Sequence, residues 1–205
     1  MDEFRNQIKE CVQKLASAFV PYMTPIPMTR SGMHPLNTLY YIKCGAVLTF
    51  NNSNAFAPLI APDFIGTHYI LGQTATHFNL EFKLLPGAEV YTIDISLAKS
   101  LAADNNLYET ISYLIARRLY DFSNITETFI NPNSSAYKKV KICISLFYEH
   151  KDILQNSIAL SSFIIECTGI SKSRVMFILS ELRKGGYITT ENGKLLAITK
   201  LPEEF

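Results

Sequence analysis

The chain has 205 residues, 48% of them apolar and 18% charged, and its 19 basic and 18 acidic side chains leave a formal net charge of +1. Such a composition is typical of a folded chain, because disordered chains are poorer in apolar residues and richer in charge. No apolar run reaches the roughly 20 residues of a membrane-spanning helix, and the amino terminus is charged where a signal peptide would be apolar. We expect a cytoplasmic protein of one or two domains with no membrane partner.

The amino-terminal half begins with a helix and continues as a β unit. Apolar side chains recur at spacings of three and four over residues 2–20, which predicts an amphipathic helix that ends at Pro21. From Leu39 to Ile95 short apolar runs alternate with Gly, Pro, Asn and Asp. This pattern predicts many short strands in one compact β unit.

A proline-free and glycine-free stretch, residues 107–130, predicts a long helix with two apolar stripes. We expect one face to pack on the β unit and the other on a second copy of the chain, as a dimer helix. The alternative is that both faces are buried within one chain. The candidate dimer contacts are Leu107, Ile111, Leu114, Arg118, Ile125 and Phe129.

Asn131 to Ser135 should break this helix, because Pro132 disfavours helical geometry at Asn131. The predicted organisation is therefore an amino-terminal helix and β unit over residues 1–104, a dimer helix over 105–130, a hinge over 131–135 and a carboxyl-terminal domain over 136–205.

The charged side chains are distributed unevenly along the chain. Residues 1–137 hold 9 basic and 11 acidic side chains, net −2, and residues 138–205 hold 10 basic and 7 acidic, net +3.

The last seventy residues predict three helices followed by a hairpin. Ser161 or Ser162 can cap the second helix, Gly169 supplies a tight turn, and Ser171 can cap the third helix. After this helix-turn-helix, Asn192-Gly193 is a strong signal for a type I′ hairpin turn, which would form a wing.

This arrangement indicates double-stranded DNA as the partner, because the start of the second helix of such a motif faces base edges in the major groove. Lys172, Ser173 and Arg174 can reach bases or phosphates, and the free N–H groups near Ser171 favour a phosphate. The full candidate set is Ser161, Ser162, Ser171, Lys172, Ser173, Arg174, Phe177, Lys184 and Lys194. For Met176 and Phe177 packing against a neighbouring domain is at least as favoured as a thymine methyl.

Several stretches resemble the CRP/FNR family of transcription regulators. They are LYYIKCGAVLTF from Leu39, PDFIG from Pro62, AEVYTIDISLAKSL from Ala88, ARRL from Ala116 and GISKSRVMFILSELRKGGYI from Gly169. The resemblance implies an α+β fold with a cyclic-nucleotide-binding-like β-roll (a double-stranded jelly roll), a long dimerisation helix that includes Arg118, and a carboxyl-terminal winged helix-turn-helix. It also implies a homodimer that works with RNA polymerase.

The closing stretch, RKGGYITTENGKLLAITKLPEEF from Arg183, is similar to a small enterobacterial branch of that family, the IprA-like (YaiV-like) regulators. What this similarity implies is transcriptional control linked to oxidative-stress resistance.

Departures from the family bear on its ligands. Gly66 is followed by Thr67 where cyclic-nucleotide binders carry Glu, and no arginine occurs between Arg30 and Arg117 to meet a cyclic phosphate. We therefore expect no cyclic AMP binding. Cys11 stands alone where iron-sulfur members carry clustered cysteines, and no histidine pattern suits a metal, so we expect no cofactor and no metal.

Cys44, Cys143 and Cys167 are candidates for thiol oxidation, although burial as small apolar side chains is the favoured interpretation. No catalytic grouping of residues is visible, so we do not expect an enzyme. The leading hypothesis is a homodimeric DNA-binding regulator. The alternatives are a thiol-redox or small-ligand sensor whose β-roll is the effector domain, and a protein-binding adaptor on the same fold.

Overall fold

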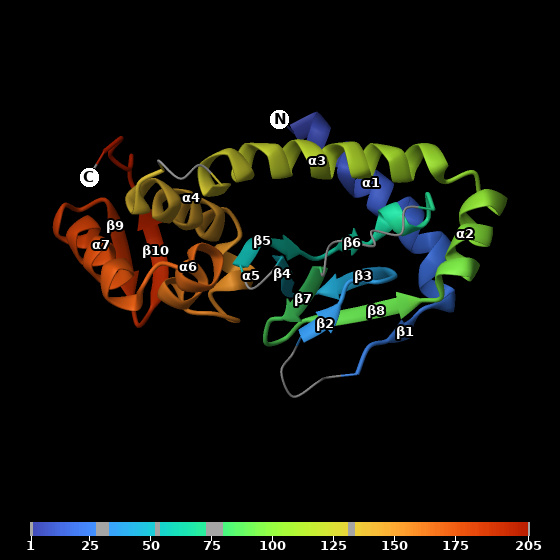
Figure 1. Cartoon of the computed structure of the whole chain (residues 1–205), viewed down its shortest axis with the longest axis horizontal. Helices are drawn as coiled ribbons and strands as arrows, with labels where there is room; N and C mark the ends of the chain where they lie inside the picture. Colours follow the sequence, from blue (N-terminus) through green and yellow to red (C-terminus); the bar gives the residue numbers. More distant parts are fainter. Residues whose placement is uncertain (1, 28–32, 52–53, 73–79, 131–133, 205) are drawn as a thin grey trace. The chain divides into compact units, whose positions relative to one another are not determined.

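The computed structural model of the chain describes residues 2–27, 33–51, 54–72, 80–130 and 134–204. These divide into two compact units, Met1–Asn52 with Pro58–Phe122 and Ser53–Ala57 with Ser123–Phe205 (Figure 1). The division falls inside the long helix α3 (Tyr108–Ile130), upstream of the predicted break at 131–135, of which 131–133 lie outside the described residues.

The first unit opens with the predicted amphipathic helix, α1 (Asp2–Phe19), followed by the 3-10 turn η1 (Val20–Tyr22). Val12, Leu15 and Phe19 lie on one face of α1 and are buried. Pro21 is tolerated in η1 because the first positions of a helical turn need no backbone N–H donor. No helix in the described part of the chain is both long and apolar enough to cross a lipid bilayer.

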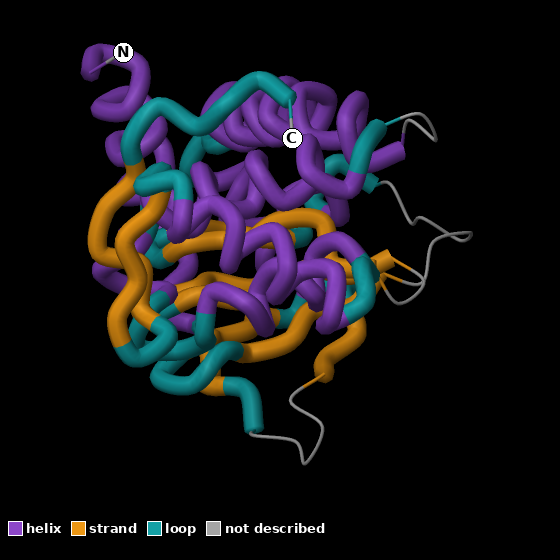
Figure 2. The backbone as a smooth tube through the Cα atoms, turned by 90° about the vertical axis from the view of Figure 1, so that its left-hand side faces the viewer, coloured by secondary structure: helices purple, strands orange, loops and turns teal. Residues whose placement is uncertain are grey.

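Two four-stranded sheets follow, which confirms the predicted β unit (orange in Figure 2). The first has the order β1 (Thr24–Pro25), β8 (Glu89–Ile93), β3 (Leu39–Cys44), β6 (Asp63–Ile65). The second has the order β2 (Met33–Pro35), β7 (Leu80–Leu84), β4 (Ala46–Asn51), β5 (Asn54–Ile60). Side chains from both sheets, among them Ile42, Val47 and Phe82, form one buried cluster.

Gly66 ends β6 and leads into the 3-10 turn η2 (Thr67–Tyr69). Its φ is +84°, a conformation that favours glycine. A Cβ atom at this position would lie 1.9 Å from the backbone oxygen of Thr38. The PDFIG stretch therefore needs its glycine because two backbone segments touch there.

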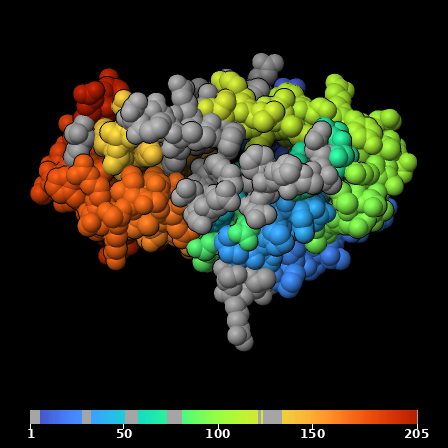
Figure 3. Space-filling model, in the orientation of Figure 1, coloured from blue at the N-terminus to red at the C-terminus, as the bar shows by residue number. Residues whose placement is uncertain are grey.

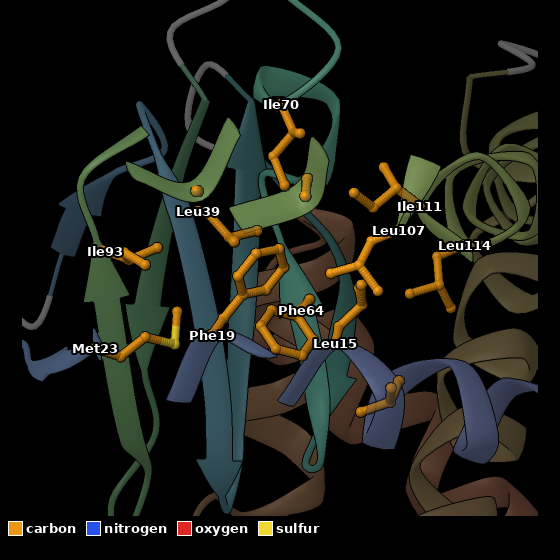
Figure 4. Close-up of a cluster of buried hydrophobic side chains, with 13 residues drawn as sticks. Leu15, Phe19, Met23, Leu39, Phe64, Ile70, Ile93, Leu107, Ile111 and Leu114 are labelled. Carbon is orange, nitrogen blue, oxygen red and sulfur yellow. The ribbon is translucent and has the colours of Figure 1, made fainter. Parts of the chain in front are cut away.

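Helices α2 (Ile95–Asp104) and α3 close the first unit. The Asp94 carboxylate caps α2 by accepting hydrogen bonds from the N–H groups of Ser96 and Leu97. Leu107, at the start of α3, and Ile111 on its first turn are almost completely buried. Figure 4 shows them packed with side chains from α1 and β6, in the cluster that includes Leu15, Phe19, Phe64 and Leu114.

This burial corrects the assignment of Leu107, Ile111 and Leu114 as dimer contacts. They are the residues with which α3 packs on its own unit, and at most 8% of each is exposed, so they have almost no surface to offer a second copy. The periodicity identified an apolar face correctly but could not distinguish between the two partners expected for the helix. The side chains of Ile125 and Phe129 lie outside the described residues.

The second unit contains α4 (Ala136–Glu149), α5 (Lys151–Leu154), α6 (Leu160–Thr168) and α7 (Lys172–Lys184), then the hairpin β9 (Ile188–Glu191) and β10 (Lys194–Ile198). Ser135 caps α4 by accepting a hydrogen bond from the Lys138 N–H at 3.2 Å. The apolar faces of α4, α6 and α7 meet in one core, whose largest members include Phe147 and Phe163. The predicted helix-turn-helix and hairpin are both present.

Candidate nucleic-acid interface

A short turn connects α6 to α7 and sets where α7 begins. Gly169 follows α6 with φ 64° and ψ 7°, and its N–H donates to the Ile165 carbonyl at 2.9 Å. The Thr168 hydroxyl donates to the Ile164 carbonyl and accepts from the Ile170 N–H. Ser171 then caps α7 by accepting a hydrogen bond from the Arg174 N–H at 3.4 Å, as the sequence predicted.

The first two turns of α7 present a cationic, partly apolar face to solvent. The exposed residues are Lys172, Ser173, Arg174, Met176 and Phe177. Val175, between them on the buried side of the helix, packs in the core. The Arg174 guanidinium lies over the Phe177 ring, with 5.6 Å between its central carbon and the ring centroid. This stacking orients both side chains on the same patch of surface. Helix α7 belongs to the orange and red part of the surface in Figure 3.

Ser161 and Ser162 do not cap α6, contrary to the sequence prediction. The helix starts one residue earlier, its N-cap is Ala159, and no side chain caps it. Leu160 is buried in the core and is already the first residue of α6. Ser161 and Ser162 therefore lie within the first turn of the helix and not before it. Ser162 is exposed and Ser161 is half-buried. With no side chain to satisfy them, the first N–H groups of α6 are available to an outside acceptor.

The wing tip has the predicted type I′ geometry, with φ of 49° at Asn192 and 79° at Gly193. It lies against the start of α6, since a Cβ on Gly193 would be 3.9 Å from the Ala159 Cβ. An open groove of about 280 Å³ separates the loop before α6 from the wing. It is lined by Gln155, Asn156, Ser157, Ile158, Ala159, Asn192, Gly193 and Lys194. Lys194 therefore stands beside the uncapped end of α6.

Two other cations lie near the end of α7. Lys184 forms an ion pair with Glu181 at 2.7 Å, so its charge is partly compensated within the helix. Arg183, which no sequence pattern indicated, is exposed and donates to the Thr190 hydroxyl on β9 at 3.4 Å. Its placement depends on how the wing folds back along α7, so spacing along the chain gave no signal for it.

A profile of winged helix-turn-helix DNA-binding domains matches residues 136–203, the whole of the region just described. Among solved structures, a c-di-GMP-responsive global regulator of Xanthomonas campestris superposes with a TM-score of 0.64 over 92% of this chain and 100% of its own, at 13% identity. A crp/fnr-family transcriptional regulator of Eubacterium rectale gives 0.63 over 90% and 89%, at 12% identity. The chain has the CRP/FNR regulator fold.

Relatives that match in sequence come from enteric bacteria. The "inhibitor of hydrogen peroxide resistance" of Escherichia coli K12 is 32% identical over 108 residues, which cover 52% of this chain and 50% of that protein. The protein of the same name from Salmonella typhimurium is 32% identical over 72 residues, 35% of each chain. The matched region thus spans about half the length of the first relative.

Within this CRP/FNR fold, the roll positions that would meet a cyclic nucleotide are only partly described. Thr67 follows Gly66 and is 8% exposed, so it offers little surface to a ribose. The segment 73–79, where the sequence lacks the expected arginine, lies outside the described residues. His34 is buried and stacks on Phe82, its Nε2 atom has no hydrogen-bond partner in the described structure, and burial lowers its pKa.

Three of the four cysteines were named as redox candidates, and the structure places them in contrasting environments. Cys44 is exposed at the end of β3, whereas Cys143 on α4 and Cys167 on α6 are buried. All four are free thiols. In the described part of the chain, no three His, Cys, Asp or Glu side chains are grouped as a metal site would require.

Proposed function

We propose that this protein is a homodimeric transcription regulator that reads duplex DNA with α7. The observation that carries the proposal is the exposed start of α7, where Lys172 and Arg174 stand together just after the Ser171 cap. In a helix-turn-helix this end of the second helix enters the major groove. The two cations supply both the attraction to phosphate and the donors that guanine accepts.

The wing supports the same orientation on DNA. Lys194 lines one side of the groove described above, and Ala159, the N-cap of α6, lines the other. Lys194 and the first N–H groups of α6 can therefore approach a single stretch of phosphate backbone. Phosphate contacts position a protein without reading sequence. Lys194, Ser161 and Ser162 are accordingly proposed as positioning contacts, and Lys184 as a weaker one because Glu181 shares its charge.

Phe177 gives the reading helix an apolar element. Its ring is 52% exposed and lies next to Arg174. Phe177 can therefore contact a thymine methyl while Arg174 donates to the edge of a neighbouring guanine. We propose that the half-site contains a thymine adjacent to a guanine. Met176, which is 41% exposed, lies on the same patch.

The dimer is proposed to form through the outer face of α3. Leu119 and Tyr120 are 63% and 61% exposed, which is unusual for large apolar side chains on a helix otherwise committed to a core. Two small residues, Ser112 and Ala116, are also exposed. Ala116 lies four residues after Ser112 and three or four before Leu119 and Tyr120, so all four lie on neighbouring turns of α3. The small side chains allow a second helix to approach closely there. Yellow-green atoms of α3 are visible at the surface in Figure 3. A dimer would present two copies of α7 to successive major grooves, about 34 Å apart.

The biological role is proposed from the relatives. Because the enteric proteins are named for inhibiting hydrogen peroxide resistance, we propose that the genes controlled by this regulator affect the same resistance. Control of transcription would take place in the cytoplasm, together with RNA polymerase, without cyclic AMP and without catalysis. The proposed division of labour is a roll over 1–104, a dimer helix over 105–130, a hinge over 131–135 and a DNA-binding domain over 136–205.

The test begins with selection of bound fragments from genomic DNA by the purified full-length protein, followed by fluorescence anisotropy on a selected duplex. Specific binding that weakens steeply as salt rises is expected. Absence of any duplex binding at low salt would reject the proposal and would leave Met176 and Phe177 as a surface for a protein partner.

The dimer is tested by sedimentation of a Leu119→Glu, Tyr120→Glu variant. The expected result is a folded monomer, because two carboxylates per helix cannot be buried against their copies without a large desolvation cost. Ser17→Glu on α1, an exposed position in the same unit, is the matched control and should remain dimeric. A dimeric double variant would exclude this face of α3 as the interface.

A further inference from the structure

The core of the second unit contains two cysteines that meet across a helix pair. Phe147 on α4 and Phe163 on α6 are in contact, with ring centroids 5.4 Å apart. Cys143 lies one turn before Phe147, and Cys167 lies one turn after Phe163, on the same faces of the two helices. In an antiparallel register, the next pair along the contact seam beyond Phe147 and Phe163 is Cys143 with Cys167.

The closeness of the two thiols agrees with this register, because Cys143 acts on the titration of Cys167. The pKa of Cys167 is raised well above its usual value, first by a hydrogen bond with the Cys143 thiol and then by burial. Cys143 is completely buried and Cys167 is 3% exposed. The other two cysteines are less buried, since Cys44 is exposed and Cys11 is half-buried on another helix. Two thiols are thus held together inside the domain that carries α7.

We propose that Cys143 and Cys167 are a disulfide-forming pair that is oxidised by a two-electron oxidant of the peroxide class. One thiol loses its proton, attacks a peroxide oxygen and becomes a sulfenic acid, and the O–O bond breaks with release of water. The second sulfur attacks the sulfenic sulfur, the S–S bond forms, and the hydroxyl leaves as a second water. Hydrogen peroxide is reduced to two waters, and the two thiols are oxidised to one disulfide.

The raised pKa of Cys167 determines the kinetics of this site. A thiolate is the reacting species, and Cys167 is protonated at neutral pH, so oxidation within the closed fold is slow. The rate should therefore increase as pH rises. Exposed Cys44 should react with alkylating agents before the buried pair does.

The disulfide would alter the turn that positions α7. Cys167 immediately precedes Thr168 and Gly169, and the Ser171 cap follows two residues later. A sulfur–sulfur bond of about 2.05 Å is much shorter than a thiol–thiol hydrogen bond, so its formation draws the last turn of α6 toward α4. The effect on DNA binding rests on the proposed function, whereas the disulfide itself does not.

The chemical test uses the full-length protein with its own tryptic sites. The purified reduced chain is treated with hydrogen peroxide, its remaining thiols are blocked with iodoacetamide, and it is digested with trypsin. Cleavage after Lys141, Lys151 and Lys172 places the two cysteines on separate peptides, 142–151 and 152–172. The expected product is a linked peptide pair, lighter by two hydrogen atoms than the sum of its parts, which a thiol reductant separates.

Cys44→Ser is the matched control and should still yield the linked pair, while Cys143→Ala and Cys167→Ala should not. Because either alanine variant could fail to fold, the decisive measurement is on the unsubstituted chain. Persistence of both peptides as separate, iodoacetamide-blocked species, after Cys44 has been fully oxidised, would overturn the proposal.

A second measurement follows DNA affinity by anisotropy in the reduced and oxidised protein. At least a tenfold weakening on oxidation, restored by reductant and retained in Cys44→Ser, is expected. A linked pair with unchanged affinity would refute coupling to α7. Failure of the reduced protein to bind DNA would instead refute the proposed function, leaving the peptide result to decide the disulfide.

Discussion

Replacing Lys172 and Arg174 together by alanine should abolish specific DNA binding while leaving the fold intact. Both side chains are exposed, and the Ser171 cap uses only the Arg174 backbone N–H, which the substitution retains. The stacking of Arg174 on Phe177 is lost, but such a contact at an exposed site contributes only about 0.5–1 kcal/mol. The main effect should therefore appear in binding.

The magnitude follows from the number of cations removed. A dimer loses four, and each phosphate contact contributes about 0.9 to the slope of log affinity against log salt concentration, so the slope should become shallower by about 3.6 if all four meet phosphate. If Arg174 reads a base, the slope change falls to about 1.8, and each lost base contact costs about 1–3 kcal/mol of discrimination. The slope and the specificity thus separate the two roles of Arg174.

The assay is anisotropy of a labelled operator duplex between about 50 and 200 mM salt, with sedimentation to verify the dimer. Lys9→Ala with Lys14→Ala is the matched control, because it removes the same charge from exposed positions on α1. The control should bind as the unsubstituted protein does. An unchanged slope and affinity in the α7 variant would refute the assignment of α7 as the reading helix.

Three further outcomes are expected. Ser171→Ala should lower the free energy of unfolding by about 1 kcal/mol through loss of the α7 cap, and Ser173→Ala, measured alongside by urea denaturation, should have little effect. Gly66→Ala should destabilise the first unit by more than the roughly 1–3 kcal/mol of a left-handed residue, since the new Cβ meets the Thr38 oxygen; normal urea unfolding would contradict the contact. Burial lowers the pKa of His34 and of His68, so the unfolded chain binds more protons and stability should fall as pH drops below about 6.5. Thermal unfolding at decreasing pH should show a smaller loss in His34→Phe, and an identical loss would exclude His34 as a contributor.

The parts of the fold that local chemistry determines could be predicted from the sequence. Asn192-Gly193 requires two positive φ angles whatever surrounds it, and both are observed. Ser171 similarly caps α7 because its hydroxyl needs only the N–H three residues later. The prediction for Ser161 and Ser162 was wrong because burial of Leu160 moved the start of α6, a tertiary effect that capping propensity does not contain.

Features that depend on which distant segments meet could not be predicted. The stripe of Leu107, Ile111 and Leu114 has the same spacing whether it packs on its own unit or on a copy. The pairing of Arg118 with Asp63 spans 55 positions and leaves no periodic signal. Cys143 and Cys167 were each visible as cysteines, but only the packing of α4 on α6 places them together.

The ion pair between Arg118 and Asp63 has a consequence for the geometry of α3. The guanidinium donates to the Asp63 carboxylate at 2.7 Å and to the Phe64 carbonyl at 3.2 Å, so two hydrogen bonds join α3 to β6. Successive helical residues are separated by about 100° around the axis, so Tyr120 lies on the side of α3 opposite Arg118 and Leu119 lies on its flank. Arg118 thereby fixes the rotation of α3 about its own axis. That rotation determines which side of α3 a neighbouring molecule can contact.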